Sequence, residues 1–310
     1  MFHVKQSDSA DAVERGALDS PLAAELLDLA ARRRILDAPP PPLPAFTRVI
    51  AVSNQKGGVG KTTTTVNMAA ALARFGARVL VIDLDPQGNA TTALGLERHE
   101  GVEGMFEVLL GERSLAEVVG ESPDLPGLFC APSTLNLAGV EITIATEADS
   151  RYRLHQAIQK HITEDRAAYH YIFIDCPPSL GLLTVNALVV AHEVMVPIQC
   201  EYYALEGVTQ LNSLIHQVNQ ALNPSLTVST VLLTMFDART NLSQDVAAVV
   251  RESFGERVLS TMIPRTVRVA EAPSHRQTVI TYDPTSLGAI AYLEAAYEFG
   301  LRNTQPAEAH

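Results

Sequence analysis

Residues 48–63 read RVIAVSNQKGGVGKTT, and this stretch decides the fold. A short β-branched run leads into a glycine-rich loop, a Lys-Thr pair and a segment rich in Ala and Leu. Glycines let consecutive backbone N–H groups turn toward one anion, and a helix N-terminus adds partial positive charge. The order of strand, glycine loop and helix therefore predicts a phosphate cradle. A glycine turn without a ligand explains neither the Lys-Thr pair nor this order.

Residues of the loop have expected roles in phosphate and metal binding, but the loop departs from the common phosphate-loop pattern. Lys61 is expected to span the β and γ phosphates, and Thr62 to ligate Mg²⁺. Gln55 stands where the strict GxxxxGK[ST] pattern has its first glycine, and Lys56 is an additional lysine. Lys56 cannot easily fold back onto its own phosphates but can reach a nucleotide held by a facing subunit. The predicted ATP or ADP contacts are Lys56, Gly57, Gly58, Val59, Gly60, Lys61, Thr62 and Thr63.

From residue 47 onward, β-branched runs alternate with longer segments of helical periodicity. The expected strands are 48–54, 78–83, 127–131, 171–175, 193–198 and 227–235. The expected helices are 61–75, 137–162, 180–191, 205–222, 243–254 and 286–301. This alternation predicts an α/β fold, a mostly parallel twisted sheet with helices on both faces, in which ligands bind at the carboxyl edge of the strands.

Two of the expected strands end in acidic residues. Asp83 and Asp85 follow the strand at 78–83, and Asp175 closes the apolar run at 171–175. ATP hydrolysis needs a group that positions water and a shell that fixes Mg²⁺. The pattern predicts that Asp175 holds Mg²⁺ through water. The alternatives are an ordinary acidic turn before proline and an aspartate that caps a helix.

Composition limits the function classes. The 310 residues are 47% hydrophobic, and 23 Lys and Arg stand against 35 Asp and Glu, a net charge of −12. Such a charge argues against a general polyanion binder, although 239–276 has a local balance of +2. Cys130, Cys176 and Cys200 form no CxxC pair, so core packing is expected. No apolar run of 18 residues or secretory signal occurs, which predicts a cytoplasmic protein without membrane insertion.

The chain is expected to divide into three parts. Residues 1–46 would form an arm with a possible short amphipathic helix over 21–37 and a proline-rich linker, or else a disordered arm. Residues 47–302 would form the nucleotide-binding domain, and 303–310 a flexible tail. The arm is a candidate contact for a polar or scaffold protein.

The string KGGVGKTTT at 56–64 resembles the signature of the deviant Walker A P-loop ATPases, which include ParA/Soj and MinD. The resemblance covers about 47–302. It implies that Lys56 contacts the ATP of the partner in a homodimer, that Asp85 orients the attacking water, and that Asp83 supports the magnesium waters. The predicted catalytic residues are therefore Lys56, Lys61 and Asp85. The stretch DLDPQGNAT at 83–91 is also similar to the family.

Two further stretches, 233–241 and 263–275, resemble the ParA/Soj branch and not MinD. By that resemblance, Arg239 and Arg268 contact nonspecific double-stranded DNA, and Pro264 and Thr266 lie on the adenine side. The family usually has asparagine at Thr266, so only a backbone contact is expected there. Without the resemblance, Arg239 and Arg268 read as solvated charges or ion pairs with Glu271 or Asp245.

The resemblance implies a nucleoid-associated switch for DNA partitioning. ATP with Mg²⁺ would form the dimer, the dimer would bind DNA, and a ParB-type protein would stimulate a slow hydrolysis that releases it. The alternative is a related ATPase that positions a protein cargo or polar complex without DNA. An iron-sulfur reductase is disfavoured because the chain lacks the necessary cysteines.

Overall fold

The computed structural model describes residues 31–99, 101–163, 168–202 and 206–302. The chain divides into two compact units, Met1–Ala38 and Pro39–His310. In the first unit, the described part contains the 3₁₀ helix η1 (Arg33–Asp37). Most of the helix predicted over 21–37, and the tail predicted at 303–310, lie outside the described residues. The division into arm, nucleotide-binding domain and tail stays a prediction.

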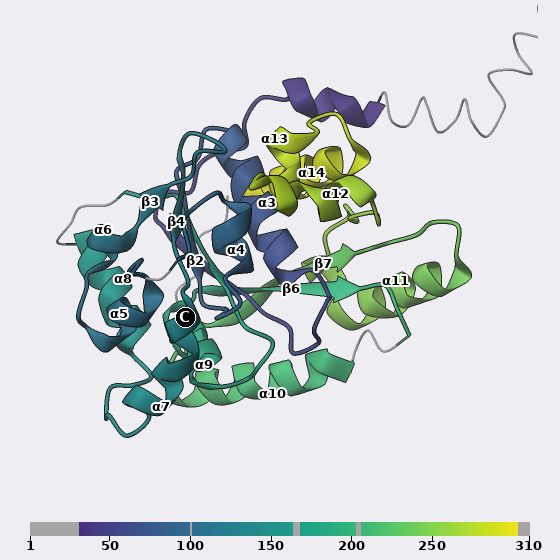
Figure 1. Ribbon diagram of the computed structural model, residues 1–310. Coiled ribbons are helices and arrows are strands. Elements are labelled where there is room, and N and C mark those ends of the chain that lie inside the picture. Colours follow the sequence, from purple (N-terminus) through teal and green to yellow (C-terminus); the bar gives the residue numbers. More distant parts are fainter. Residues whose placement is uncertain (1–30, 100, 164–167, 203–205, 303–310) are drawn as a thin grey trace, which may run out of the picture. The chain divides into compact units, whose positions relative to one another are not determined.

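A seven-stranded sheet forms the centre of the second unit (Figure 1). Its order is β3-β4-β2-β5-β1-β6-β7. The strands are β1 (Arg48–Val52), β2 (Val79–Asp83), β3 (Gly120–Glu121), β4 (Leu128–Ala131), β5 (Tyr171–Asp175), β6 (Glu193–Gln199) and β7 (Thr227–Thr234). All pairings are parallel except that of β3 with β4. The predicted α/β fold with a mostly parallel sheet is confirmed.

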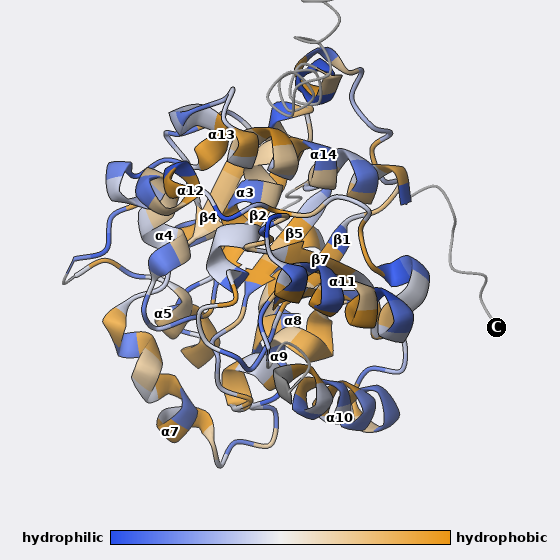
Figure 2. Ribbon diagram, turned by 90° about the vertical axis from the view of Figure 1, so that its right-hand side faces the viewer, coloured by the Kyte–Doolittle hydropathy of each residue, from blue (hydrophilic) through white to orange (hydrophobic). Residues whose placement is uncertain are grey.

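Helices cover both faces of this sheet (Figure 1). On one face, α3 (Lys61–Arg74) packs against α14 (Leu287–Leu301), whose Phe299 contacts Tyr171 and Phe173 of β5. On the other, α9 (Leu182–Val190) lies between α8 (Arg153–Thr163) and α10 (Glu206–Ala221). Figure 2 shows the apolar strands enclosed by helices with hydrophilic outer turns. Strands covered on both faces are apolar throughout, as β1, β2 and β5 are.

The helix predicted over 137–162 is wrong as a single element. The chain instead forms η2 (Leu135–Gly139), α7 (Val140–Ile144), a turn and then α8. The turn holds Thr146, Asp149 and Ser150, whose short polar side chains compete with helical hydrogen bonds. The buried Asn186 of α9 then accepts the backbone N–H of Leu154 at 3.1 Å, which fixes the start of α8.

Several short elements are absent from the sequence prediction. They are α4 (Asn89–Ala93), α5 (Met105–Leu110), α6 (Leu115–Val118), β3, η3 (Gly255–Arg257), α12 (Val267–Glu271), η4 (Ala272–His275) and α13 (Val279–Tyr282). The predicted helix at 243–254 is α11, which begins earlier, at Asn241, because Thr240 caps it through the N–H of Ser243. Elements of six residues or fewer are too short to show a clear period.

The order of the strands fixes the position of the phosphate loop. Because β1 lies between β5 and β6, the loop that follows it emerges at the carboxyl edge with strands on both sides. Cys130, Cys176 and Cys200 are buried and form no disulfide, as expected for core packing. Among the described helices, none has the length and apolar character needed to cross a membrane.

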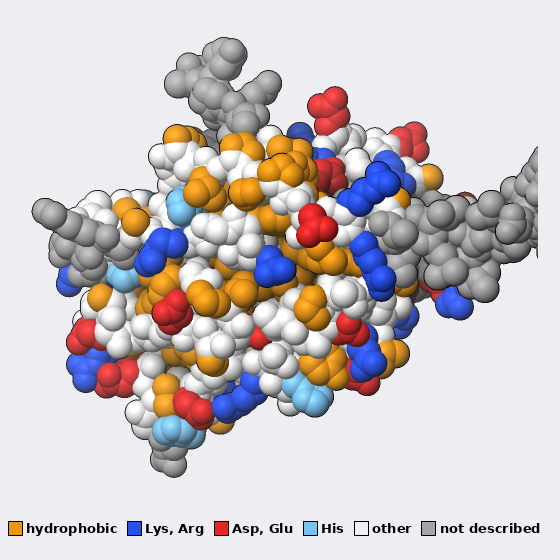
Figure 3. Space-filling model, turned by 90° about the horizontal axis from the view of Figure 1, so that it is seen from above, with side chains coloured by type: hydrophobic (Ala, Val, Ile, Leu, Met, Phe, Trp, Pro, Cys, Tyr) orange, Lys and Arg blue, Asp and Glu red, His pale blue; other side chains and the backbone are white. Residues whose placement is uncertain are grey.

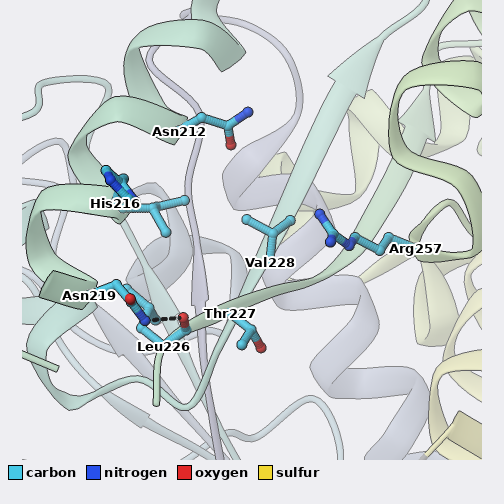
Figure 4. A pocket seen from close by; sticks show the side chains of 8 residues that line it. Asn212, His216, Asn219, Leu226, Thr227, Val228 and Arg257 are labelled. Carbon is cyan, nitrogen blue, oxygen red and sulfur yellow. Dashed lines mark hydrogen bonds between the residues drawn. The ribbon is translucent and has the colours of Figure 1, made fainter. Parts of the chain in front are cut away.

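A pocket of about 570 Å³ lies elsewhere, between α10, the start of β7 and Arg257 (Figure 4). Asn219 closes one side, where its Nδ2 donates to the carbonyl of Leu226 at 3.0 Å. Thr227 and Val228 line it at the amino end of β7, whereas Thr234 at the other end contacts the phosphate loop. The pocket is therefore not part of the site at the carboxyl edge.

Candidate nucleotide-binding site

The phosphate loop has the backbone that its glycines predict. Gly58 and Gly60 have φ of 75° and 87°, a region that favours glycine. A Cβ added at Gly57 or Gly58 would meet open space, so a ligand can approach the backbone there. Thr234 at the end of β7 donates to the carbonyl of Val59 at 2.8 Å and anchors the loop. The loop thus fits a phosphate group.

Lys61 begins α3 and points back across the loop. Its side chain is buried, and its Nζ donates to the carbonyl of Lys56 at 3.3 Å. Burial lowers the pKa of Lys61, while the nearby Asp175 and Asp85 raise it. A cation in this position is poorly solvated, and an anionic phosphate would compensate it. Thr62 and Thr63 follow in the first turn of α3, beside the same loop.

Two buried aspartates lie side by side at the ends of neighbouring strands. Asp83 of β2 and Asp175 of β5 are register partners. Burial, followed by the charge of Asp83, raises the pKa of Asp175 to about 8. Asp175 Oδ1 accepts from Thr65 at 3.1 Å, but its buried Oδ2 has no hydrogen-bond partner among the described residues. This orphaned oxygen fits a divalent cation or one of its water ligands.

Asp83 organises the loop that carries Asp85. Its Oδ1 accepts the N–H of Asp85 at 3.2 Å, and its Oδ2 accepts the N–H and the hydroxyl of Thr91 at 2.8 and 2.6 Å. Burial raises the pKa of Asp83 to about 6, although these hydrogen bonds lower it. Both oxygens are therefore engaged with the chain itself. The role of Asp83 in holding magnesium waters stays a prediction.

Asp85 is held from several sides. Its Oδ1 accepts the N–H of Gln87 at 2.9 Å, and its carbonyl accepts both the N–H of Gly88 and the hydroxyl of Ser133 at 2.8 Å. Ser133 follows β4 and is fully buried. The sequence prediction missed Ser133, although the carboxyl end of a parallel strand is where a polar residue of the site is expected.

Lys56 lies at the surface of the loop. Its Nζ is 3.8 Å from a carboxylate oxygen of Glu201, which also pairs with Arg265 at 3.2 Å. The side chain of Lys56 is 30% exposed. The Lys56 side chain therefore lies at the surface, although its backbone carbonyl accepts from the buried Lys61. Contact of Lys56 with a nucleotide of a second subunit stays a prediction.

Pro264 lies near the end of β7, whereas the Thr266 side chain caps the helix α12. Pro264 forms a parallel bridge with Phe236, two residues beyond Thr234. Met235, between Thr234 and Phe236, has an unusual φ of 51°. Its Cε lies 4.0 Å from where a Cβ on Gly60 would be. Thr266 Oγ1 accepts the N–H of Val269 and caps α12. Adenine contact at Pro264 and Thr266 stays a prediction.

The two arginines that were predicted to contact DNA lie on two different segments, and each forms ion pairs with acidic side chains. Arg239 follows β7, and its guanidinium bonds both oxygens of Asp237, at 2.9 and 2.8 Å. Arg268 of α12 pairs with Glu271 and Asp283, at 3.1 and 3.3 Å. On the face seen in Figure 3, Lys and Arg side chains are scattered among acidic and apolar ones. DNA binding by either arginine stays a prediction.

Comparisons with known proteins agree with this geometry. A family model described as an AAA domain matches residues 47–228. Over 251 residues, 81% of the chain, the protein is 46% identical to the sporulation initiation inhibitor protein Soj of Bacillus subtilis (97% of that protein) and 48% identical to the chromosome partitioning protein ParA of Caulobacter vibrioides (93%).

Among solved structures, cobyrinic acid a,c-diamide synthase from Mycobacterium smegmatis with a bound ATP analogue and magnesium is 40% identical, with a TM-score of 0.69. The match covers 81% of this chain and 93% of that one. Sequence similarity and fold thus extend over the phosphate loop and both acidic strand ends. The chain belongs to the ParA/Soj family of chromosome-partitioning ATPases.

Proposed function

We propose that this chain is an ATP-driven partitioning switch, in which ATP and Mg²⁺ assemble two subunits, the dimer binds nonspecific double-stranded DNA, and hydrolysis releases it. The observation that carries the proposal is the convergence of Lys61, Asp175 and the Asp85 loop at one edge of the sheet, with one Asp175 oxygen buried and orphaned. The relative solved with an ATP analogue and magnesium supports the choice of ligand.

The residues present fit magnesium-bound ATP. Backbone N–H groups from Gly57 to Thr62 would hold the phosphates, and Lys61 would balance their charge. Thr62 and, through water, Asp175 would hold Mg²⁺, which supplies charge neutralisation at the transferring phosphate. Asp85 would orient the attacking water. Family resemblance assigns Lys56 to the phosphates of the partner subunit.

The DNA step rests on Arg239 and Arg268, which are exposed and belong to stretches that resemble the ParA/Soj branch. Both would exchange their present carboxylate partners for DNA phosphates, a contact that is independent of base sequence and weakened by salt. A ParB-type protein bound to centromere-like sites would stimulate hydrolysis. The names of the relatives, which refer to chromosome partitioning, support this sequence of events.

The test is retention on nonspecific duplex DNA at two salt concentrations with ATP, ADP or no nucleotide. We expect ATP-specific, salt-sensitive retention that is lost in Lys56→Ala and Arg268→Ala and persists in Asp85→Ala, which binds ATP without hydrolysing it. Arg113→Ala is the matched control, since Arg113 is also a partly exposed arginine in an ion pair, with Glu103. Equal retention with ATP and ADP, or full retention in Arg268→Ala, would contradict the proposal.

A second candidate is a switch that positions a protein cargo or polar complex without DNA. It is favoured by the ion pairs that occupy Arg239 and Arg268 and by the net charge of −12. Combined substitution Arg239→Ala and Arg268→Ala separates the two functions. Unchanged localisation in cells, with ATP-dependent dimerisation intact and no DNA retention in vitro, would favour cargo positioning.

A further inference from the structure

Arg98 reaches back to the loop that carries Asp85. It lies beyond α4, and its Nη2 donates to the carbonyl of Pro86 at 2.6 Å, a contact between residues twelve positions apart. Its Nε is buried and has no partner among the residues that the structure describes. The guanidinium group is therefore packed against this loop and not extended into solvent.

Gly88 provides the space in which Arg98 lies. It has φ of 62° and caps the start of α4. A Cβ added at Gly88 would lie 2.0 Å from Arg98 Nε and 2.4 Å from Cζ. No side chain fits here while the guanidinium is present, so the glycine and the arginine are matched to each other.

The contact acts on the segment between Asp85 and α4. Within that segment, Asp85 accepts the N–H groups of Gln87 and Gly88, which forms a tight turn. The Pro86 carbonyl lies inside the turn, directly after Asp85, and Arg98 ties it to the chain that follows α4. Arg98 therefore contacts the backbone next to Asp85 through the Pro86 carbonyl.

We propose that Arg98, seated in the space that Gly88 leaves, is a positioning residue that fixes the loop of Asp85 for water activation. The proposal rests on the proposed function, because it assigns Arg98 an effect on hydrolysis through Asp85. Loss of the guanidinium leaves the Pro86 carbonyl without this donor and the loop with more freedom. Small errors in the position of a catalytic group reduce the rate of the chemical step more than they reduce substrate binding.

Two different substitutions should cause the same decrease in the rate of hydrolysis. Arg98→Ala removes the guanidinium, and Gly88→Ala displaces it with a Cβ. The double variant should therefore be no slower than the slower single variant, because the contact can be lost only once. Arg98→Lys keeps a donor that can reach the Pro86 carbonyl and should restore part of the rate.

The experiment is steady-state hydrolysis of ATP with Mg²⁺ by the full-length chain, with kcat and KM determined separately. We expect kcat about tenfold lower in Arg98→Ala and Gly88→Ala, with KM changed by less than about twofold. Gly76→Ala is the matched glycine control, since Gly76 has φ of 88° and a Cβ there would meet nothing within 4 Å. Arg113→Ala is the arginine control. Both controls should keep the wild-type kcat.

Thermal unfolding of each variant separates loss of fold from loss of rate. Wild-type kcat in Arg98→Ala, additive losses in the double variant, or an equal loss in Gly76→Ala would each overturn the inference. Asp85→Ala separates this failure from that of the proposed function. If Asp85→Ala hydrolyses ATP at the wild-type rate, both fail; if Asp85→Ala is inactive while Arg98→Ala is normal, only the inference fails.

Discussion

The two lysines of the phosphate loop lie in opposite surroundings. Lys61 is buried beside Asp175 and Asp85, whereas Lys56 is partly exposed and paired with Glu201. An exposed ion pair contributes about 0–1 kcal/mol, so Lys56 can leave Glu201 at little cost. Glu201 would thus compete weakly with a phosphate of a second subunit, the contact proposed for Lys56.

Substitution Glu201→Gln should therefore strengthen ATP-dependent dimerisation. The change removes a competing charge from both Lys56 and Arg265, and we expect an association constant about threefold higher, which corresponds to less than 1 kcal/mol. Sedimentation with ATP in an Asp85→Ala background, which keeps the nucleotide intact, measures it. Glu103→Gln, which breaks the ion pair with Arg113, is the control. Unchanged or weaker association in Glu201→Gln would rule out this competition.

The sequence identified the candidate residues that belong to local motifs and missed those brought in by the fold. Lys61, Thr62 and Asp175 were found because a phosphate loop and an acidic strand end are continuous in sequence. Ser133 and Arg98 act on the Asp85 loop from 48 and 12 residues away. A single serine or arginine carries no sequence signal of such a contact, because the contact depends on the pairing of strands and on the path of the chain after α4.

At the scale of elements, the opposite edge of the sheet is held by two histidines. His192 Nδ1 accepts the N–H of Val49 in β1 at 3.2 Å, and His170 Nδ1 accepts the N–H of Arg78, just before β2, at 2.8 Å. Burial, with the nearby Arg78, lowers the pKa of His170. Burial also lowers the pKa of His192, with Arg48 and His155 adding to the effect and Glu193 opposing it. Both acceptor nitrogens must be unprotonated.

Acidification should therefore destabilise the fold. Below the ordinary histidine pKa of about 6.5, the unfolded chain binds protons that the folded chain, with its lowered pKa values, does not. Stability is full above that pH and is lost as the pH falls. Between pH 7.5 and 5.5 we expect His192 to contribute a loss of less than about 1 kcal/mol, measured by denaturant unfolding, because the imidazole is exposed and its hydrogen bond with Val49 is only partly buried.

Two variants test whether His192 causes this loss of stability. His192→Asn should show a smaller decrease between the two pH values than the wild type, whereas His216→Asn, on the exposed side of α10, should show the same decrease as the wild type. An equal decrease in all three proteins would place the pH dependence in other groups.

The sequence also predicted long elements better than short ones. The six expected strands lie within two residues of β1, β2, β4, β5, β6 and β7, because buried parallel strands are continuous apolar runs bounded by turns. The helix over 137–162 was wrong because its apolar spacing continues across a polar turn that the buried Asn186 stabilises from another helix. Such tertiary capping is not visible in the local sequence.

At the scale of the whole molecule, the arm that was predicted to end at residue 46 contains a residue, Pro41, that belongs to the second unit and packs there. Pro41 is buried, and its Cγ lies 2.7 Å from where a Cβ on Gly300 of α14 would be. Gly300 leaves the space that the proline ring fills. Part of the proline-rich segment therefore covers α14.

Two deletions should differ for this reason. Removal of 1–38 keeps Pro41 and should leave the thermal midpoint of the second unit unchanged. Removal of 1–46 exposes the apolar surface around Gly300 and should lower stability by about 1 kcal/mol, or about 2–4 °C. Calorimetry of both proteins measures the difference, and Pro41→Ser in the full chain should give part of the same loss. Equal midpoints would show that Pro41 contributes nothing.

The position of β1 between two strands that follow it in the chain also has a consequence for biosynthesis. The strand that leads into the phosphate loop is translated early. The two strands that pair with it, β5 (Tyr171–Asp175) and β6 (Glu193–Gln199), are translated much later. A growing polypeptide therefore carries β1 unpaired on the ribosome while more than one hundred further residues are added, and such long-range pairing is slow and prone to aggregation. A truncated product that ends before β5 has the complete KGGVGKT motif and yet lacks both strands that pair with β1, so it lacks the framework that positions the loop.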